Sequence, residues 1–207
     1  MVETLDLGAW FGEIDIYLFD QLLKGRLAPA DRILDAGCGD GRNLPYFLRA
    51  GFDVCAVDES PDAVSRVRSL AATLAPHLPA TNFRVEPVDA LSFEPGSFEG
   101  VISSAVLHFA RDAEHFDRML REMWRVLRPG GIFFCRLAST IGIEDLVHHI
   151  EGRRYWLPDG SERFLADEDL IVRATRELRG DLLEPIKTVN VQHQRAMTTW
   201  VARKRNA

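Results

Sequence analysis

Hydrophobic and polar positions along this chain form blocks that predict helices and strands in alternation. Apolar side chains recur at helical spacing over 13–23 and again over 61–74. Short apolar runs at 32–35 and 52–57 predict buried strands, and a helix over 43–50 joins them. Because strand, helix and strand follow one another, this region is typical of one βαβ unit with parallel strands.

The alternation continues through the middle of the chain. Further strands are expected over 82–85, 98–103 and 132–138, and a helix from Asp112 to Leu127 precedes the last of them. Strands that alternate with helices indicate an α/β fold, in which helices cover both faces of a mostly parallel sheet.

The regular alternation stops over 138–166. A short helix over 143–150 and a β-hairpin turning at 158–160 are expected there. The last two segments, 182–194 and 195–204, predict strands with a close connection, which pair antiparallel at one edge of the sheet.

Composition narrows the class of protein. The 207 residues are 46% hydrophobic, which is enough for one core and one domain. A net charge of −6, from 25 basic and 31 acidic residues, argues against a nucleic-acid binder. No apolar stretch is long enough to cross a membrane, and no secretory signal is expected. Three cysteines at no metal-ligand spacing predict reduced thiols in the cytoplasm and no metal site.

The chemistry is concentrated in a glycine loop that follows the first strand. Gly37, Gly39 and Gly41 allow close approach of the backbone to a ligand and place amide groups at a helix start. Asp58 ends the next strand, where a carboxylate can accept both hydroxyls of a ribose. A dinucleotide loop needs a glycine where Arg42 stands, which disfavours a pyrophosphate ligand.

Several motifs in 31–136 resemble those of the class I S-adenosylmethionine (SAM) dependent methyltransferases. LDAGCGDG looks like their first motif, LRPGG matches their turn before the fifth strand, and GSFEGVISS matches their fourth strand, with Glu99 where aspartate is usual. GRN at 41–43 and WVARK at 200–204 also look like tellurite-resistance-type methyltransferases.

This resemblance implies a Rossmann-like, seven-stranded sheet of order 3-2-1-4-5-7-6 with strand 7 antiparallel. It implies SAM as cofactor and S-adenosylhomocysteine (SAH) as product. Asp35 is then expected at the methionyl ammonium, Asp58 at the ribose and Asp89 at the adenine amino group. The residues expected at the cofactor are Asp35, Gly37, Cys38, Gly39, Gly41, Arg42, Asn43, Asp58, Glu59, Ser60, Asp89, Ala90, Ser103 and Ser104.

Catalytic and substrate contacts are less sharply indicated. His108 follows the fourth strand and is either a general base or substrate contact, or a histidine packed in the core. Segment 1–30 is expected to form an N-terminal helical cap and 138–166 a lid, within a single domain over 1–207. The possible substrate contacts in these segments are Trp10, Tyr17, Arg154, Tyr155 and Trp156.

The predicted activity is transfer of the SAM methyl group to a small-molecule acceptor by in-line displacement. The tetrapeptide that such enzymes use for planar amino groups is absent, because SSAV stands at 103–106. Nucleic acid and membrane are not expected as partners, and the oligomeric state is open. Two alternatives remain, a SAM-binding sensor or assembly protein without catalysis and an NAD(P)-linked oxidoreductase.

Overall fold

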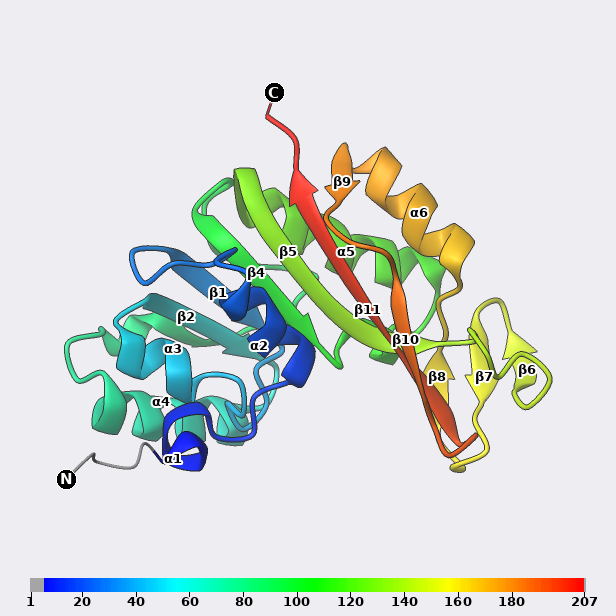
Figure 1. Cartoon of the computed structure of the whole chain (residues 1–207), viewed down its shortest axis with the longest axis horizontal. Coiled ribbons are helices and arrows are strands. Elements are labelled where there is room, and N and C mark those ends of the chain that lie inside the picture. The colour runs from blue at the N-terminus through cyan, green and yellow to red at the C-terminus, as the bar shows by residue number, and fades with distance from the viewer. Residues whose placement is uncertain (1–5, 207) are drawn as a thin grey trace.

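A twisted eight-stranded sheet forms the centre of the computed structural model, which describes residues 6–206 (Figure 1). The part of the predicted N-terminal cap over 1–5 lies outside the described residues. The strands of this sheet are β1 (Arg32–Ala36), β2 (Asp53–Asp58), β3 (Phe83–Val85), β4 (Phe98–Ser104), β5 (Leu127–Ser139), β9 (Gly180–Leu182), β10 (Lys187–Val191) and β11 (Arg195–Lys204).

The strand order is β10-β11-β5-β4-β1-β2-β3, which confirms the predicted seven-strand order. β1 pairs in parallel with β2 and β4, whereas β11 is antiparallel to β5 and β10. The short β9 also pairs with β11 and is an eighth strand that the sequence pattern did not indicate. The carboxyl ends of the parallel strands therefore meet along one edge, where open α/β sheets bind their ligands.

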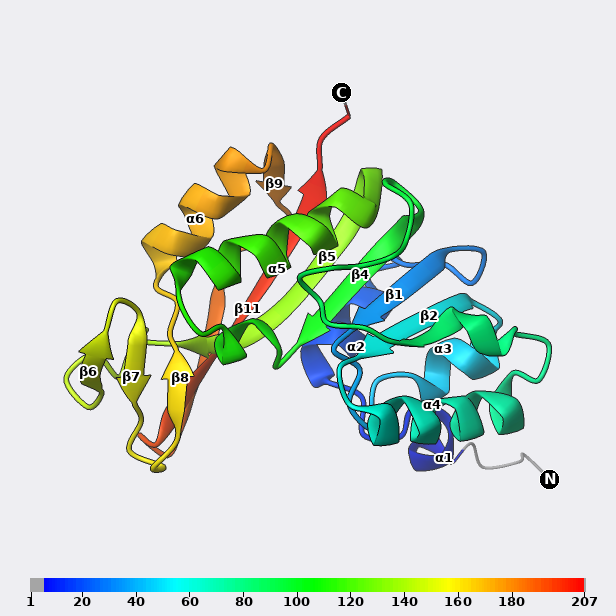
Figure 2. The same ribbon diagram turned by 180° about the vertical axis from the view of Figure 1, so that it is seen from behind.

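Helices cover both faces of the sheet, and side-chain caps define where most of them begin (Figures 1 and 2). Asp15, Ser60, Asp112 and Asp167 each accept a hydrogen bond from a backbone amide in the first turn of a helix. The helices are α1 (Leu7–Phe11), α2 (Ile16–Leu23), α3 (Pro45–Ala50), α4 (Pro61–Leu74), α5 (Ala113–Val126) and α6 (Glu168–Glu177), with 3-10 turns η1 (Ala80–Asn82) and η2 (Leu107–Phe109).

Two large clusters of buried side chains stabilise the layers. On one face of the sheet, α2, α3 and α4 pack on residues such as Ile33 and Phe134. On the other face, α5 and α6 pack on residues such as Phe133 and Trp200. Alternate residues of the central strands point to opposite faces, so strands covered on both sides are apolar almost throughout.

The predicted helix over 143–150 is wrong. Its second half is the strand β6 (His148–Glu151), which pairs with β7 (Arg154–Trp156), and β7 pairs with β8 (Glu162–Phe164). Apolar residues at helical spacing suggested the helix, but pairing of β6 with the predicted hairpin satisfies its backbone groups instead. The resulting three-stranded sheet stands beside the carboxyl end of β5 (Figure 2).

Smaller differences concern element boundaries. The predicted helix over 13–23 begins at Ile16, because the Asp15 side chain caps it. The predicted turn at 129–131 lies inside β5, where the pairing of β4 with β5 is shifted in register. Among the described residues, every helix is too short or too polar to cross a membrane.

Candidate functional site

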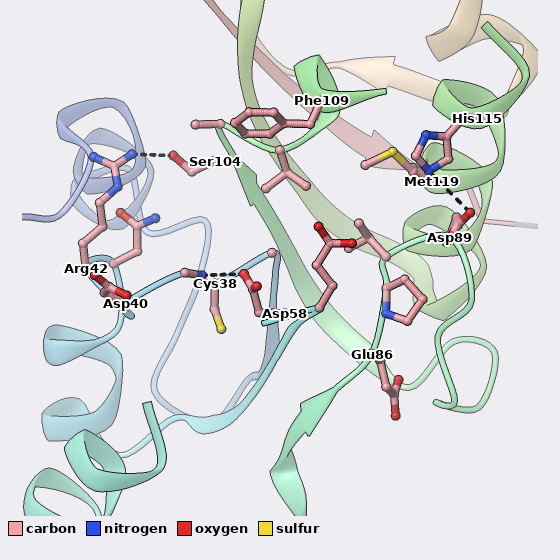
Figure 3. Close-up of a pocket in the computed structure, with 18 of the residues that line it drawn as sticks. Cys38, Asp40, Arg42, Asp58, Glu86, Asp89, Ser104, Phe109, His115 and Met119 are labelled. Atoms are coloured by element: carbon pink, nitrogen blue, oxygen red, sulfur yellow. Dashed lines mark hydrogen bonds and ion pairs between the residues drawn. The ribbon is translucent and has the colours of Figure 1, made fainter. Parts of the chain in front are cut away.

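A cavity of about 630 Å³ opens at the carboxyl ends of β1, β2 and β4 (Figure 3). Its volume is typical of pockets for cofactors and other small molecules. The walls come from the glycine loop, the residues after β2 and β4, the segment after β3, and the start of α5. Residues predicted at the cofactor that line this cavity are Gly37, Cys38, Gly39, Arg42, Asn43, Asp58, Glu59, Asp89 and Ser104.

The three glycines of the glycine loop have positive φ angles, which residues with a side chain rarely adopt. Gly37 has φ 79°, and a Cβ atom there would stand 2.5 Å from Cγ2 of Val106. Gly41 has φ 77°, and a Cβ atom there would stand 3.0 Å from Val67 of α4. Gly39, with φ 51°, faces open space instead, because no atom lies within 4 Å of its ideal Cβ position. Gly37 and Gly41 thus fit the loop to the fold, while Gly39 leaves room for a ligand.

Asp58 is held in place by the backbone on both sides of its carboxylate. The amide of Gly39 donates to Oδ2 at 2.9 Å, and the amide of Ser60 donates to Oδ1 at 2.9 Å. Each carboxylate oxygen keeps a further lone pair that can accept a hydrogen bond. The carboxylate is therefore oriented by the protein itself and is available to a pair of ligand hydroxyls.

Asp35 lies beneath the loop rather than in the cavity wall and is 1% exposed. Its Oδ2 atom has no hydrogen-bond partner among the described residues. Burial raises the pKa of Asp35 to about 7, and the positive charge of Arg42 opposes this shift. A buried carboxylate without a donor is costly, so the site favours a ligand that brings a hydrogen-bond donor or a positive charge.

Asp89 is positioned by a histidine that sequence reasoning missed. Nε2 of His115, in the first turn of α5, lies 3.4 Å from Oδ2 of Asp89 (Figure 3). Nδ1 of His115 accepts a hydrogen bond from the amide of Arg111 at 3.2 Å, which places the proton of the neutral ring on Nε2. Asp89 is thus turned toward α5 at the far end of the cavity from Arg42.

A buried polar network at the other end was also missed. Asp15, with its side chain fully buried, accepts a hydrogen bond from Arg136 at 2.7 Å and lies 3.6 Å from Arg42. Arg42 donates to Ser104 Oγ at 2.9 Å, and Asn43 Oδ1 accepts the Asp15 amide at 2.9 Å. The buried Asp15 carboxylate thus interacts with two guanidinium groups, and one of them, that of Arg42, lines the cavity. No local motif indicated Asp15 and Arg136, because they meet only in the folded chain.

The residues after β4 form an apolar wall. Ala105 has φ 65°, a left-handed conformation that is rare for alanine, and its amide donates to the Arg136 carbonyl at 2.7 Å. Val106, Phe109 and Met119 complete this side of the cavity, and the Phe109 side chain is drawn across its edge in Figure 3. Cys38 lines the opposite side, where burial raises the pKa of its thiol, so it remains protonated and poorly nucleophilic.

His108 does not line the cavity and is unsuited to act as a base. Its Nδ1 atom accepts a hydrogen bond from the amide of Ala138 at 3.1 Å, so the neutral ring carries its proton on Nε2. Burial lowers its pKa to about 4, and the positive charges of Arg163 and Arg195 lower it further. The geometry thus supports the packed alternative and not the base.

Other predicted site residues do not line the cavity. Ser60 caps α4 and Ser103 is fully buried in β4. The Tyr17 ring lies under the Arg136 guanidinium, with 5.4 Å between its centroid and Cζ. Residues predicted at the site that do not line the cavity are Asp35, Gly41, Ser60, Ala90, Ser103, His108, Trp10, Tyr17, Arg154, Tyr155 and Trp156. Within 6–206, no group of three or more His, Cys, Asp or Glu residues could hold a metal ion.

Comparison with known proteins shows that the chain is similar to methyltransferases. Residues 34–135 match the family described as a methyltransferase domain. Bovine (Bos taurus) EEF1A lysine methyltransferase 4 is 32% identical over 159 residues, covering 70% of this chain and 57% of the relative. Ubiquinone biosynthesis O-methyltransferase of Methylocella silvestris is 31% identical over 161 residues, covering 72% of this chain and 59% of the relative.

A solved structure shows the same fold. The 1,6-didemethyltoxoflavin-N1-methyltransferase of Burkholderia thailandensis, with 1,6-didemethyltoxoflavin and SAH bound, aligns with a TM-score of 0.68. It is 22% identical, and the alignment covers 91% of this chain and 76% of the other. By this domain match and these relatives, the chain resembles the class I SAM-dependent methyltransferases. It spans less than two thirds of the length of the curated relatives above, at 57% and 59%.

The described residues fit the cofactor of this family. Asp35 has an unpartnered carboxylate oxygen beside the loop, as an ammonium group requires. Asp58 is oriented to accept hydroxyls, and Asp89 stands at the far end of the same cavity. Gly39 leaves space between them. Carboxylates at these positions also suit a molecule with a positively charged sulfonium.

Proposed function

We propose that this chain transfers a methyl group from SAM to a small-molecule acceptor. The observation that carries the proposal is the Asp58 carboxylate, held by the amides of Gly39 and Ser60 next to a loop with room for a ligand. When bound, SAM supplies an activated methyl group on a positively charged sulfur. The protein then needs to bind, orient and exclude water, which can lower a barrier by roughly 7–11 kcal/mol in favourable cases.

Each part of the chain has a distinct task in this proposal. Asp58 holds the ribose, Asp89 the adenine amino group, and Asp35 the ammonium. Arg42 is the arginine of the described cavity wall, and it attracts the cofactor carboxylate. Val106, Phe109 and Met119 exclude water from the reacting end. The predicted single domain over 1–207, its cap over 1–30 and its lid over 138–166 are part of the same proposal.

A protein acceptor is the second candidate, since one relative is named a lysine methyltransferase. The apolar wall of Val106, Phe109 and Met119 at the cavity supports a small acceptor instead. The sensor without catalysis remains the third reading. The match to a methyltransferase domain argues against the NAD(P)-linked alternative.

Titration calorimetry with SAH tests the cofactor site. Asp58→Asn should weaken SAH binding at least tenfold, because it removes the charge and places an NH2 group against one of two donating amides. Asp53→Asn is the matched control at the opposite end of β2, where Asp53 pairs with Arg32 on the surface. SAH affinity that is equal in all three proteins contradicts the proposed site.

Methyl-labelled SAM then separates the acceptor classes. A cell extract is divided by ultrafiltration into small molecules and proteins, and each fraction is incubated with the enzyme. Label that enters the small-molecule fraction supports the proposal. Label on protein favours the second candidate, and no transfer in either fraction with SAH binding intact favours the sensor.

A further inference from the structure

The cavity and its mouth carry opposite charge. Most charged residues of the cavity wall are acidic. Among the described residues that line it, the basic ones are Arg42 and His115. The acidic lining residues are Glu13, Asp40, Asp58, Glu59, Glu86 and Asp89. Such a wall attracts a positively charged cofactor and repels an anion. An anionic acceptor therefore needs positive charge outside this wall.

Positive charge stands beside Phe109. The Arg163 guanidinium of β8 lies over the Phe109 ring, 4.8 Å from its centroid, and donates to the Glu162 carbonyl at 2.6 Å. Phe109 both lines the cavity and is 59% exposed, so it connects the cavity to the surface. Within residues 6–206, no carboxylate oxygen approaches the Arg163 side-chain nitrogens within 4.0 Å.

A second arginine adjoins the first. Arg195, the first residue of β11, lies 3.9 Å from Asp159, which also accepts hydrogen bonds from the Ser161 amide and hydroxyl. Arg163 and Arg195 both act on the neighbouring His108 ring, which is uncharged at neutral pH. Among the described residues, Arg195 thus has one carboxylate partner and Arg163 has none within 4.0 Å, which leaves a local positive excess in a chain of net charge −6.

Neighbouring arginines of the same insert are neutralised. Arg153 pairs with Asp167 at 2.8 Å, and Arg154 pairs with Glu162. The other two arginines of the insert are paired with carboxylates. The general abundance of arginine in the chain therefore does not explain why Arg163 is unpaired among the described residues. A guanidinium on an aromatic ring at a cavity edge suits a planar anion, which can bind the fork of donors and pack on the ring.

We propose that Arg163 and Arg195 form the acceptor subsite and bind a carboxylate carried by a planar acceptor that packs on Phe109. This inference rests on the proposed function and names its substrate class. Arg163 makes the principal contact, because it is half-buried on the ring, and Arg195 adds attraction from the exposed side. The acceptor would enter between η2 and the insert, opposite the acidic wall.

Benzoate and benzamide are the probes, since they share a planar ring and differ in charge. Each is titrated into the SAH-saturated full chain by calorimetry. Benzoate should bind at least tenfold more tightly than benzamide. Arg163→Gln should remove that preference, Arg195→Gln should reduce it about threefold, and Arg163→Lys should retain most of it. Arg173→Gln, an exposed change on α6, should leave it unaltered.

Equal binding of the two probes, or no binding of benzoate, overturns the inference. So does a benzoate preference that Arg163→Gln leaves intact in a protein whose melting temperature is unchanged. If Arg163→Gln lowers the melting temperature, Arg163→Lys and Arg195→Gln decide the result. Failure of SAH to bind at all is a different outcome, which contradicts the proposed function and not this subsite.

Discussion

The two ends of the site are built in different ways. At the cofactor end, the Asp58 carboxylate and the glycine loop are fixed by backbone amides from adjacent stretches of chain. At the proposed acceptor subsite, Arg163 of β8 lies over Phe109 of η2, and Arg163 and Arg195 of β11 both act on His108, although these elements are distant in sequence. The conformation of the first region is therefore set by the backbone. The second region depends on individual side chains, each of which can be substituted without changing the backbone.

Glycine substitutions test this difference most severely. Gly37→Ala should lower the free energy of unfolding by about 3 kcal/mol, because a left-handed alanine is strained and its Cβ would overlap Val106. Gly142→Ala, in the insert, has nearly the same φ, 77°, but no atom within 4 Å of the new Cβ. It should cost only about 1 kcal/mol. Urea denaturation of both variants measures the difference.

The Gly37 effect should be relieved in part by a second substitution. Val106→Ala removes the methyl groups that the new Cβ would meet, so the double variant should be more stable than Gly37→Ala alone. Equal destabilisation by the two glycine variants would show that the loop tolerates a side chain as readily as the insert does.

Acid stability tests the acceptor end. Burial and two arginines hold the pKa of His108 at about 4, below the ordinary value of 6.5. As pH falls from about 6.5 to 4, the unfolded chain binds a proton that the native ring does not. The free energy of unfolding should therefore fall by about 3 kcal/mol over this range.

His108→Asn should remove most of this decrease in the free energy of unfolding at acid pH. Asparagine Oδ1 can accept the Ala138 amide in place of Nδ1, so the fold should be kept. Denaturation curves at several pH values measure the slope, and methyl transfer by the variant should stay within a few-fold of the parent. A loss of transfer above a hundredfold, with folding intact, would restore His108 as a catalytic base.

The smallest expected effect concerns Asp35. Its raised pKa, about 7, means that the native carboxyl stays protonated while the unfolded one ionises above about 4. The contribution of Asp35 to stability thus declines as pH rises from about 4 to 7. Asp35→Asn should raise the free energy of unfolding of the ligand-free protein by about 1 kcal/mol at pH 8, and it should weaken SAH binding. Thermal melts with and without SAH show whether the two changes oppose each other.

Much of the fold was predictable because its signals are local. Buried strands such as β2 and β5 contain continuous apolar runs, and Asp112 marks the start of α5 by its side-chain cap. The glycine loop and Asp58 were predicted for the same reason, since strand, turn and helix follow directly in the chain. The close connection between the last two segments also predicted their antiparallel pairing.

The rest required the folded chain. Apolar residues over 143–150 fit a helix, and only pairing with β7 decides for a strand. Asp15 and Arg136 meet across the sheet, and His115 reaches Asp89 from another element. His108 has the right residue type for a base, but the amide of Ala138 occupies its acceptor nitrogen. Partners distant in sequence set each of these outcomes.

The boundary of the methyltransferase-domain match has a consequence for redesigning substrate choice. The matched segment ends at 135, so the insert over 138–166 and β11 lie beyond it. Arg163 and Arg195 therefore lie outside the segment that holds the glycine loop and Asp58. The proposed acceptor subsite can thus be redesigned on β8 and β11 while the residues proposed to bind the methyl donor are kept.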